Sequence, residues 1–157
     1  SSLKSGGIFY GLAGNDKKSA LRSLVGVLRL PAGADREMLL KMLLAREAMA
    51  STGLGEGIAL PHARNPLVFQ VTEPQIALAF LKSPVDFKAL DGKPVYALFS
   101  LITPTVRVHL HLLSRLAFAL QDNGFREIIR RQEKEDIIFR ELARVEAAFA
   151  PAAGKAQ

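Results

Sequence analysis

His62 follows a short apolar run and a proline, a position in which an imidazole can do chemistry. Residues 58–60 have the composition of a short strand, and the strand must stop at Pro61 because proline is confined to strand ends and edges. The histidine would then project from the end of the strand. A neutral imidazole is a nucleophile at ordinary pH and can carry a phosphoryl group covalently. An ordinary surface histidine is the alternative.

Three glycines stand at alternate positions before this histidine: Gly53, Gly55 and Gly57. Glycine adopts backbone conformations closed to other residues, so such a loop can approach a small group and direct amide N–H groups at an anion. Arg46 and Arg64 flank the segment, and a guanidinium binds phosphoryl oxygens through a planar fork of donors. The pattern indicates an imidazole beside an anion site, although a glycine-rich loop is also a common turn and Arg64 can be a solvated loop residue.

Arg46 falls at the end of the apolar stripe of an expected helix, seven positions after Leu39 and three after Leu43. A guanidinium that points inward needs a counter-ion. That counter-ion is either a phosphoryl group or one of three carboxylates: Glu47, Glu56 or Asp86. The spacing leaves both possibilities open.

The length of 157 residues fits one domain, residues 1–157, with a core of ordinary size. Hydrophobic residues make up 49% and charged residues 23%, which excludes a disordered chain, and no apolar run is long enough to span a bilayer. The absence of cysteine excludes disulfides, thiolate chemistry and cysteine-based zinc sites, and is compatible with a cytoplasmic location. Residues 1–7 and 151–157 are expected to be flexible.

The first third of the chain predicts one strand and two helices. Residues 8–10 are apolar and aromatic between glycines, as in a strand. Asn15 or Asp16 can cap a helix whose apolar residues recur at three- and four-residue steps. Asp35 caps a second helix that runs to Ala50.

Residues 75–81 and 95–102 are continuous apolar runs. A strand that is apolar on both faces requires helices above and below its sheet. The predicted class is therefore α/β, a single-domain sandwich of a central mixed β-sheet covered by helices on both faces. Between the two runs, residues 82–93 predict a strand fragment and a turn at Asp91 and Gly92.

A helix predicted for residues 106–121 separates two histidines. His109 shares an apolar stripe with Leu112 and Leu116, whereas His111 falls on another face. His109 therefore faces inward, either as a core histidine satisfied by one hydrogen bond or as part of a site.

Residues 125–131 and 133–149 predict two further amphipathic helices. Their basic side chains are matched one for one by acidic ones. The net charge of +6 is therefore not gathered in these helices, and no aromatic interleaving accompanies it. This balance argues against a nucleic-acid partner.

Three runs around the first histidine are Arg46-Glu47, Ser51-Thr52-Gly53-Leu54-Gly55 and Gly57-Ile58-Ala59-Leu60-Pro61-His62. Together they resemble the signature of the fructose/mannitol/nitrogen-type enzyme IIA domains of the bacterial phosphoenolpyruvate-dependent phosphotransferase system. The resemblance covers about residues 17–149, with the later runs 85–87, 90–95 and 109–110 in family-like order.

The resemblance implies that His62 is the phosphorylated residue and that Arg46 sits against the phosphoryl group. It implies a second active-site imidazole, which is His109 or, because nitrogen-type members carry histidines at both places, His111. Supporting contacts to the phosphoryl group are implied for the residues Ser51, Thr52, Gly53, Gly55, Gly57 and Arg64.

Three functions are compatible with the sequence. The first is a cytoplasmic phosphocarrier without a cofactor, which takes a phosphoryl group from an HPr-like or NPr-like protein and passes it to an enzyme IIB. The second is a regulator, resembling nitrogen-type members, whose target protein depends on phosphorylation of His62. The third is a metal-dependent hydrolase using the three histidines, but His109 and His111 point to different helix faces, so we expect no metal site. None of these functions needs nucleic acid or membrane insertion.

Overall fold

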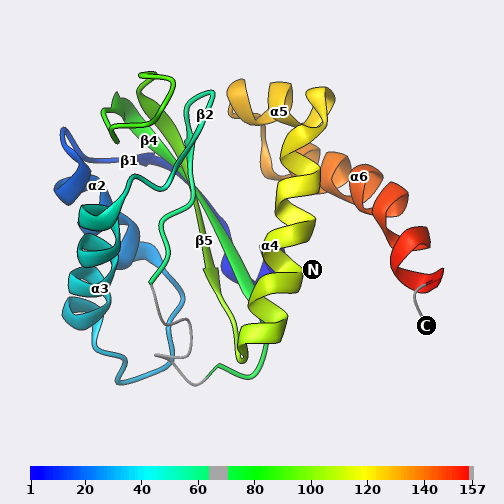
Figure 1. Ribbon diagram of the computed structural model, residues 1–157, viewed down its shortest axis with the longest axis horizontal. Helices are drawn as coiled ribbons and strands as arrows, with labels where there is room; N and C mark the ends of the chain where they lie inside the picture. The colour runs from blue at the N-terminus through cyan, green and yellow to red at the C-terminus, as the bar shows by residue number, and fades with distance from the viewer. Residues whose placement is uncertain (64–70, 156–157) are drawn as a thin grey trace. The chain divides into compact units, whose positions relative to one another are not determined.

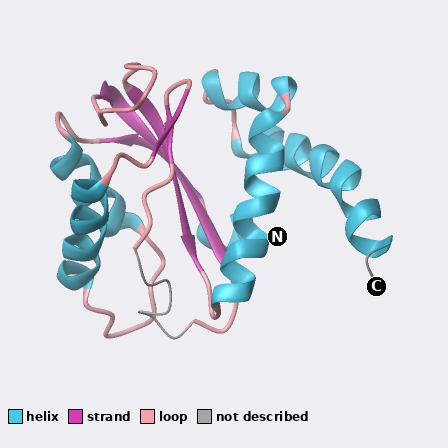
Figure 2. Ribbon diagram, viewed as in Figure 1, coloured by secondary structure: helices cyan, strands magenta, loops and turns pink. Residues whose placement is uncertain are grey.

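The computed structural model describes residues 1–63 and 71–155, with side chains up to Phe149. The described residues form six helices and five strands (Figures 1 and 2). The helices are α1 (Ser2–Gly6), α2 (Lys17–Val27), α3 (Arg36–Met49), α4 (Val106–Gln121), α5 (Asn123–Arg130) and α6 (Glu135–Lys155). The strands are β1 (Ile8–Leu12), β2 (Gly53–Gly55), β3 (Ile58–Ala59), β4 (Gln75–Val85) and β5 (Val95–Ile102). They divide into two compact units, Ser1–His109 and Leu110–Gln157, so the expectation of a single domain stays a prediction.

The first unit is built on a mixed sheet with the strand order β1-β4-β5-β3-β2. β1 runs parallel to β4, and β3 runs parallel to β5. The pairs β4–β5 and β2–β3 are antiparallel. The predicted α/β class with a mixed sheet is confirmed.

β4 and β5 lie at the centre of the sheet and are buried along most of their length, as their continuous apolar sequences predict. Helices α2 and α3 lie together on one face of the sheet (Figure 1). Leu24 of α2 and Leu43 of α3 pack into one apolar cluster with Ala79 of β4 and Leu98 of β5. Full burial of a leucine side chain stabilises the fold by about 1.5–3 kcal/mol, so this layer holds the strands firmly in place.

Both helices of this layer begin at the predicted caps. Asp16 accepts a hydrogen bond from the backbone N–H of Ser19 at 2.8 Å, and the Ser19 hydroxyl accepts one from the N–H of Asp16 at 3.2 Å. Asp35 accepts from the N–H of Met38 at 3.0 Å. These bonds satisfy N–H groups that have no partner within the helix and so define where each helix starts.

The start of the chain departs from the expectation that residues 1–7 are flexible. Ser2–Gly6 form α1, and Leu3 is only 1% exposed. A Cβ on Gly6 would clash with the backbone of Ile76, so α1 lies directly against β4. The expectation is wrong because these contacts join residues far apart in sequence, which local composition does not reveal. At the other end, α6 continues through residues 151–155, which we also expected to be flexible, and residues 156–157 lie outside the described part of the chain.

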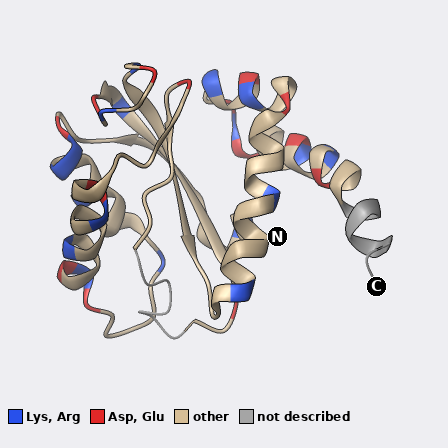
Figure 3. Ribbon diagram, in the orientation of Figure 1, with Lys and Arg blue, Asp and Glu red and all other residues tan. Residues whose placement is uncertain are grey.

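The second unit contains α4 from Leu110 onward, α5 and α6. Phe125 and Ile129 of α5 are fully buried. Asp122 caps α5 by accepting the N–H of Phe125 at 2.9 Å and also pairs with Arg144 of α6 at 2.7 Å. Charges of both signs are interspersed along α5 and α6 (Figure 3), in line with the matching seen in the sequence.

None of the described helices combines the length and the apolar character that crossing a bilayer would need.

Candidate active site

His62 lies just beyond the hairpin formed by β2 and β3. β3 pairs with β5 through Ile58 and Ala59, and the N–H of Leu60 then donates to the carbonyl of Thr52 at 3.0 Å. Pro61 has no N–H and ends this pairing. His62 follows in a half-buried position, so the strand brings the imidazole to a site that is held by the sheet and still partly open to solvent.

One hydrogen bond decides which nitrogen of His62 is available. Nδ1 lies 2.8 Å from the carbonyl oxygen of Leu60. A carbonyl oxygen only accepts hydrogen bonds, so Nδ1 must carry the proton and donate it. In the neutral ring the lone pair is then on Nε2. The local backbone therefore leaves Nε2, and not Nδ1, with the available lone pair on the neutral His62 ring.

His109 lies beside this ring, with 6.3 Å between the ring centroids and 45° between the ring planes. The side chain is buried, with 8% of the residue exposed, as the apolar stripe of its helix predicts. It sits in the first turn of α4, which begins where the Thr105 hydroxyl accepts the N–H of Val108 at 3.1 Å. Nδ1 of His109 is buried and has no hydrogen-bond partner among the described residues.

Burial lowers the pKa of His109 below its ordinary value of 6.5, and the neighbouring His62 lowers it further. Both effects disfavour the charged imidazolium. The neutral ring of His109 is therefore favoured at pH 7. The site thus places beside His62 a second imidazole whose buried Nδ1 has no partner among the described residues.

Arg46 lies at the C-terminal end of α3 and is half-buried. Its Nη1 donates to the carbonyl of Ala50 at 2.8 Å, which places a positive charge where the helix dipole favours one. The three acids considered as its counter-ion each pair with a lysine instead: Lys17–Glu47 at 3.2 Å, Lys93–Glu56 at 2.9 Å and Lys88–Asp86 at 3.5 Å. The salt-bridge interpretation of Arg46 is therefore wrong for these acids.

Ser51 and Thr52 connect α3 to β2, and both hydroxyls are used within the fold. Ser51 donates to the carbonyl of Phe87 and accepts the N–H of Gly53 at 3.0 Å. Thr52 is 5% exposed, and both its hydroxyl and its N–H donate to the carboxylate of Glu47. Thr52 is thus tied to α3, and a direct bond from either hydroxyl to a phosphoryl group stays a prediction.

The three glycines shape the β2–β3 hairpin. Gly57 has a φ of 84°, which other residues rarely adopt, and a Cβ there would clash with the ring of Tyr96. Gly53 and Gly55 lie close against Ala89 and Asp91. Small size at these positions is needed for packing, and a role of their amides at an anion stays a prediction.

Asp91 fastens this hairpin to the loop before β5. Its carboxylate accepts the N–H of Glu56 at 2.8 Å and the N–H of Lys93 at 3.0 Å. These two hydrogen bonds, led by the one from Glu56, lower the pKa of Asp91. The hairpin that precedes His62 is therefore held at its tip as well as at its base.

Two predicted residues are not brought into this site by the described structure. Arg64 lies outside the described residues. His111 is exposed and belongs to the second unit. Of the candidates for the second imidazole, His109 is therefore the one that the described residues place beside His62.

Glu47 and Lys17 were missed as functional candidates by the sequence reasoning. Glu47 continues the apolar stripe of α3, four positions after Leu43 and seven after Leu40, and a carboxylate in such a stripe signals a buried ion pair. Its partner could not be identified, because Lys17 comes from another helix.

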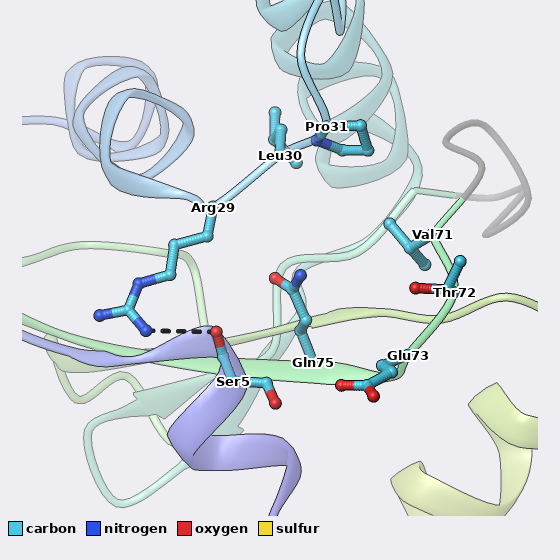
Figure 4. A pocket seen from close by; sticks show the side chains of 8 residues that line it. All are labelled: Ser5, Arg29, Leu30, Pro31, Val71, Thr72, Glu73 and Gln75. Carbon is cyan, nitrogen blue, oxygen red and sulfur yellow. Dashed lines mark hydrogen bonds between the residues drawn. The ribbon is translucent and has the colours of Figure 1, made fainter.

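A cavity of about 340 Å³ opens at a different part of the first unit (Figure 4). Its lining consists of Ser5, Arg29, Leu30, Pro31, Val71, Thr72, Glu73 and Gln75. Arg29 donates to the carbonyls of Lys4 at 3.2 Å and Ser5 at 3.3 Å, so its guanidinium is occupied by the end of α1. None of the predicted site residues lines this cavity.

Among the described residues, no three His, Cys, Asp or Glu side chains are grouped to hold a metal ion.

Comparison with known proteins identifies a family whose model spans both units. Residues 1–145 match the model described as "Phosphoenolpyruvate-dependent sugar phosphotransferase system, EIIA 2". The chain is 34% identical over 141 residues to a nitrogen regulatory protein of Pseudomonas aeruginosa, covering 87% of this chain and 89% of that protein. It is 36% identical over 127 residues to the fructose-specific EIIABC component of Bacillus subtilis, covering 78% of this chain but only 19% of that longer protein.

Solved structures share the fold. The nitrogen regulatory protein IIA-Ntr of Neisseria meningitidis superimposes with a TM-score of 0.74 at 29% identity, covering 86% of this chain and 92% of that one. A complex of enzyme IIAMTL and phosphorylated enzyme IIBMTL from Escherichia coli matches with a TM-score of 0.65 at 22% identity, covering 87% and 93%. At that lower identity the likeness is one of fold.

Proposed function

Because this chain belongs to the phosphoenolpyruvate-dependent sugar phosphotransferase system EIIA 2 family, which acts in phosphoryl transfer, we propose that it accepts a phosphoryl group on Nε2 of His62 and passes it to another protein. The observation that carries this proposal is the hydrogen bond from Nδ1 of His62 to Leu60. That bond leaves Nε2 unprotonated on a half-buried ring, which is what attack on a phosphorus atom requires.

His109 is the second imidazole of this mechanism. Its lowered pKa favours the neutral ring before transfer, so His109 adds no positive charge beside the nucleophile. Once the group is on His62, the Nδ1 of His109 has no competing partner among the described residues and can donate to a phosphoryl oxygen. Phosphoryl transfer depends mainly on positioning and charge neutralisation, and both are supplied by such a neighbour.

Arg46 is the supporting cation. Its one described hydrogen bond is to the Ala50 carbonyl at the end of a helix, a partner that a phosphoryl group can replace. A guanidinium binds a phosphate dianion more strongly than a neutral carbonyl, because both partners are then charged. Thr52, Ser51, Arg64 and the hairpin glycines complete the proposed phosphoryl environment.

The proposed donor is a small HPr-like or NPr-like protein, and the proposed acceptor is an enzyme IIB. A protein of the same fold has been solved with phosphorylated enzyme IIB, which supports this type of acceptor. The test is incubation with phosphoenolpyruvate, enzyme I and an HPr-like carrier, followed by intact-mass measurement. We expect the mass of one phosphoryl group on the wild type and none on His62→Ala.

Labelling that persists in His62→Ala would exclude this residue as the acceptor. The pair His109→Gln and His111→Gln identifies the second imidazole. We expect slower transfer only in His109→Gln, because His109 is the one whose ring lies 6.3 Å from His62. The reverse result would assign the role to His111.

A regulatory use of the same phosphorylation is the second candidate. It is favoured by the relative in Pseudomonas aeruginosa, which is called a nitrogen regulatory protein and matches this chain over 89% of its own length. In that case the phosphoryl group on His62 changes which protein is bound. Sugar-uptake phenotypes, set beside pull-downs with the phosphorylated and unphosphorylated forms, separate the two uses.

A further inference from the structure

The ion pair between the buried Glu47 and the partly exposed Lys17 has no part in the function proposed so far. Glu47 of α3 is 6% exposed and lies 3.2 Å from the ammonium group of Lys17 on α2. The Lys17 ammonium also stands 5.3 Å from the centre of the buried ring of Phe87. A buried carboxylate is costly unless it is paired and hydrogen-bonded, so a pair at this position calls for a structural reason.

The second partner of Glu47 is Thr52, the residue that leads into β2. The N–H of Thr52 donates to Oε1 of Glu47 at 3.2 Å, and its hydroxyl donates to Oε2. With Lys17, the carboxylate thus receives three donors. Both the backbone and the side chain of Thr52 are fastened to α3 in this way.

From Thr52 the hydrogen bonds continue to the nucleophile. The carbonyl of Thr52 accepts the N–H of Leu60 at 3.0 Å. The carbonyl of Leu60 accepts Nδ1–H of His62 at 2.8 Å. The N–H and the carbonyl of Leu60 lie in adjacent peptide units that share one Cα, and the Pro61 that follows confines Leu60 to an extended conformation, so holding its N–H also limits where its carbonyl points.

We propose that Glu47, held by Lys17, is a positioning residue for phosphoryl acceptance: through Thr52 and Leu60 it fixes the tautomer and orientation of the His62 imidazole. This rests on the proposed function, because the tautomer matters only if Nε2 of His62 is the nucleophile. Glu47 touches neither the phosphoryl group nor the reacting nitrogen. Its effect reaches them through two backbone hydrogen bonds.

A purely structural role for Glu47 makes a different prediction. Loss of the ion pair would then lower the free energy of unfolding and leave the ring of His62 unchanged in the protein that remains folded. A positioning role changes the ring itself. The population of the Nδ1–H tautomer of His62, read from long-range ¹H–¹⁵N correlations of its ring, therefore distinguishes the two roles before any transfer is measured.

The variants are Glu47→Gln, Thr52→Val and Thr52→Ser, with Glu37→Gln as the matched control. Glu37 lies on the same helix and pairs with Arg22 at 2.9 Å, but both side chains are more than half exposed. Thr52→Val removes only the hydroxyl and keeps the shape of the side chain, and Thr52→Ser restores the hydroxyl. Each variant is compared for tautomer population and for the rate and donor KM of phosphoryl acceptance.

We expect Glu47→Gln and Thr52→Val to lose part of the Nδ1–H tautomer and to accept the phosphoryl group about 10–100-fold more slowly, by analogy with the loss of groups that orient metal-binding imidazoles. The donor KM should stay unchanged, Glu37→Gln should behave like the wild type, and Thr52→Ser should recover most of the Nδ1–H tautomer that Thr52→Val loses. If Glu47→Gln does not fold, Thr52→Val tests the proposal in its place, because it keeps the Glu47 carboxylate paired with Lys17.

Folded Glu47→Gln and Thr52→Val variants with the wild-type tautomer and rates within about twofold of Glu37→Gln would overturn the proposal. Failure of the wild type itself to accept a phosphoryl group would instead refute the proposed function. The tautomer measurement separates the two outcomes, since it needs no donor protein.

Discussion

Phosphorylation of His62 should raise the pKa of His109. In the unmodified protein, burial and, to a smaller degree, the neighbouring His62 hold the pKa of His109 below 6.5. A phosphoryl group on His62 brings negative charge to the ring beside it, and a nearby opposite charge favours the imidazolium form. Phosphorylation of His62 would therefore favour protonation of the neighbouring His109.

The size of this effect follows from the distance of 6.3 Å between the two rings. At 6.3 Å and an effective dielectric constant of about 20, one negative and one positive charge attract each other by about 2.6 kcal/mol. This energy corresponds to about an eightyfold tighter binding of the proton. Coupling free energies are reciprocal, so a protonated His109 stabilises the phosphoryl group on His62 by the same factor.

The assay is an NMR titration of the His109 ring in the unmodified and phosphorylated proteins, over the neutral and alkaline range. His111→Gln simplifies the assignment to two histidines. In parallel, the equilibrium of phosphoryl transfer from the donor protein is measured against pH. It should shift towards phosphorylated His62 as the pH falls, and His109→Gln should remove this dependence.

A His109 ring that titrates at the same pH in both forms would refute the electrostatic coupling. The pH dependence of stability offers an independent check that the pKa of His109 is lowered in the unmodified protein. Because the pKa of His109 is lowered in the folded protein, the unfolded chain binds this proton more tightly. Its contribution to stability is therefore fully present above about pH 6.5 and declines as the pH falls below that value, and His109→Gln should flatten this decline.

Two further predictions concern the two units separately. Gly57→Ala should destabilise the protein more than Gly33→Ala. Both residues have positive φ, so an alanine at either position costs about 1–2 kcal/mol of backbone strain. At Gly57 the new Cβ also meets the ring of Tyr96, and displacing that ring adds about 1–3 kcal/mol. Equal losses of unfolding free energy in the two variants, measured by urea unfolding, would contradict this prediction. In the second unit, hydrogen bonds from Arg130 lower the pKa of Glu127 to about 2, so stability due to Glu127 is present above pH 4.5 and is lost as the pH falls towards 2. Thermal midpoints measured across this range should fall less steeply in Glu127→Gln than in the wild type.

The class of the fold and the main elements could be predicted from the sequence because they depend on local patterns. Continuous apolar runs identify β4 and β5, and Asp16 and Asp35 mark the starts of two helices. The inward position of His109 follows from the 3.6-residue period of α4. Each of these features is encoded within about a dozen residues.

The features that could not be predicted depend on contacts between distant parts of the chain. The pairing of Lys17 with Glu47 joins two helices, and the docking of α1 joins the first residues to β4. Arg46 was expected to face either a phosphoryl group or an acid, but its Nη1 donates to a backbone carbonyl four residues away. Periodicity reports which face of an element is buried, and it does not report which partner lies there.

Helix α4 belongs to both compact units. Its first turn ends the first unit with His109, and from Leu110 it continues as the opening helix of the second. A helix joins its residues by a continuous ladder of hydrogen bonds. His109 lies in the first turn of α4, where the Thr105 hydroxyl accepts the N–H of Val108, so the direction of its ring depends on the backbone of that turn.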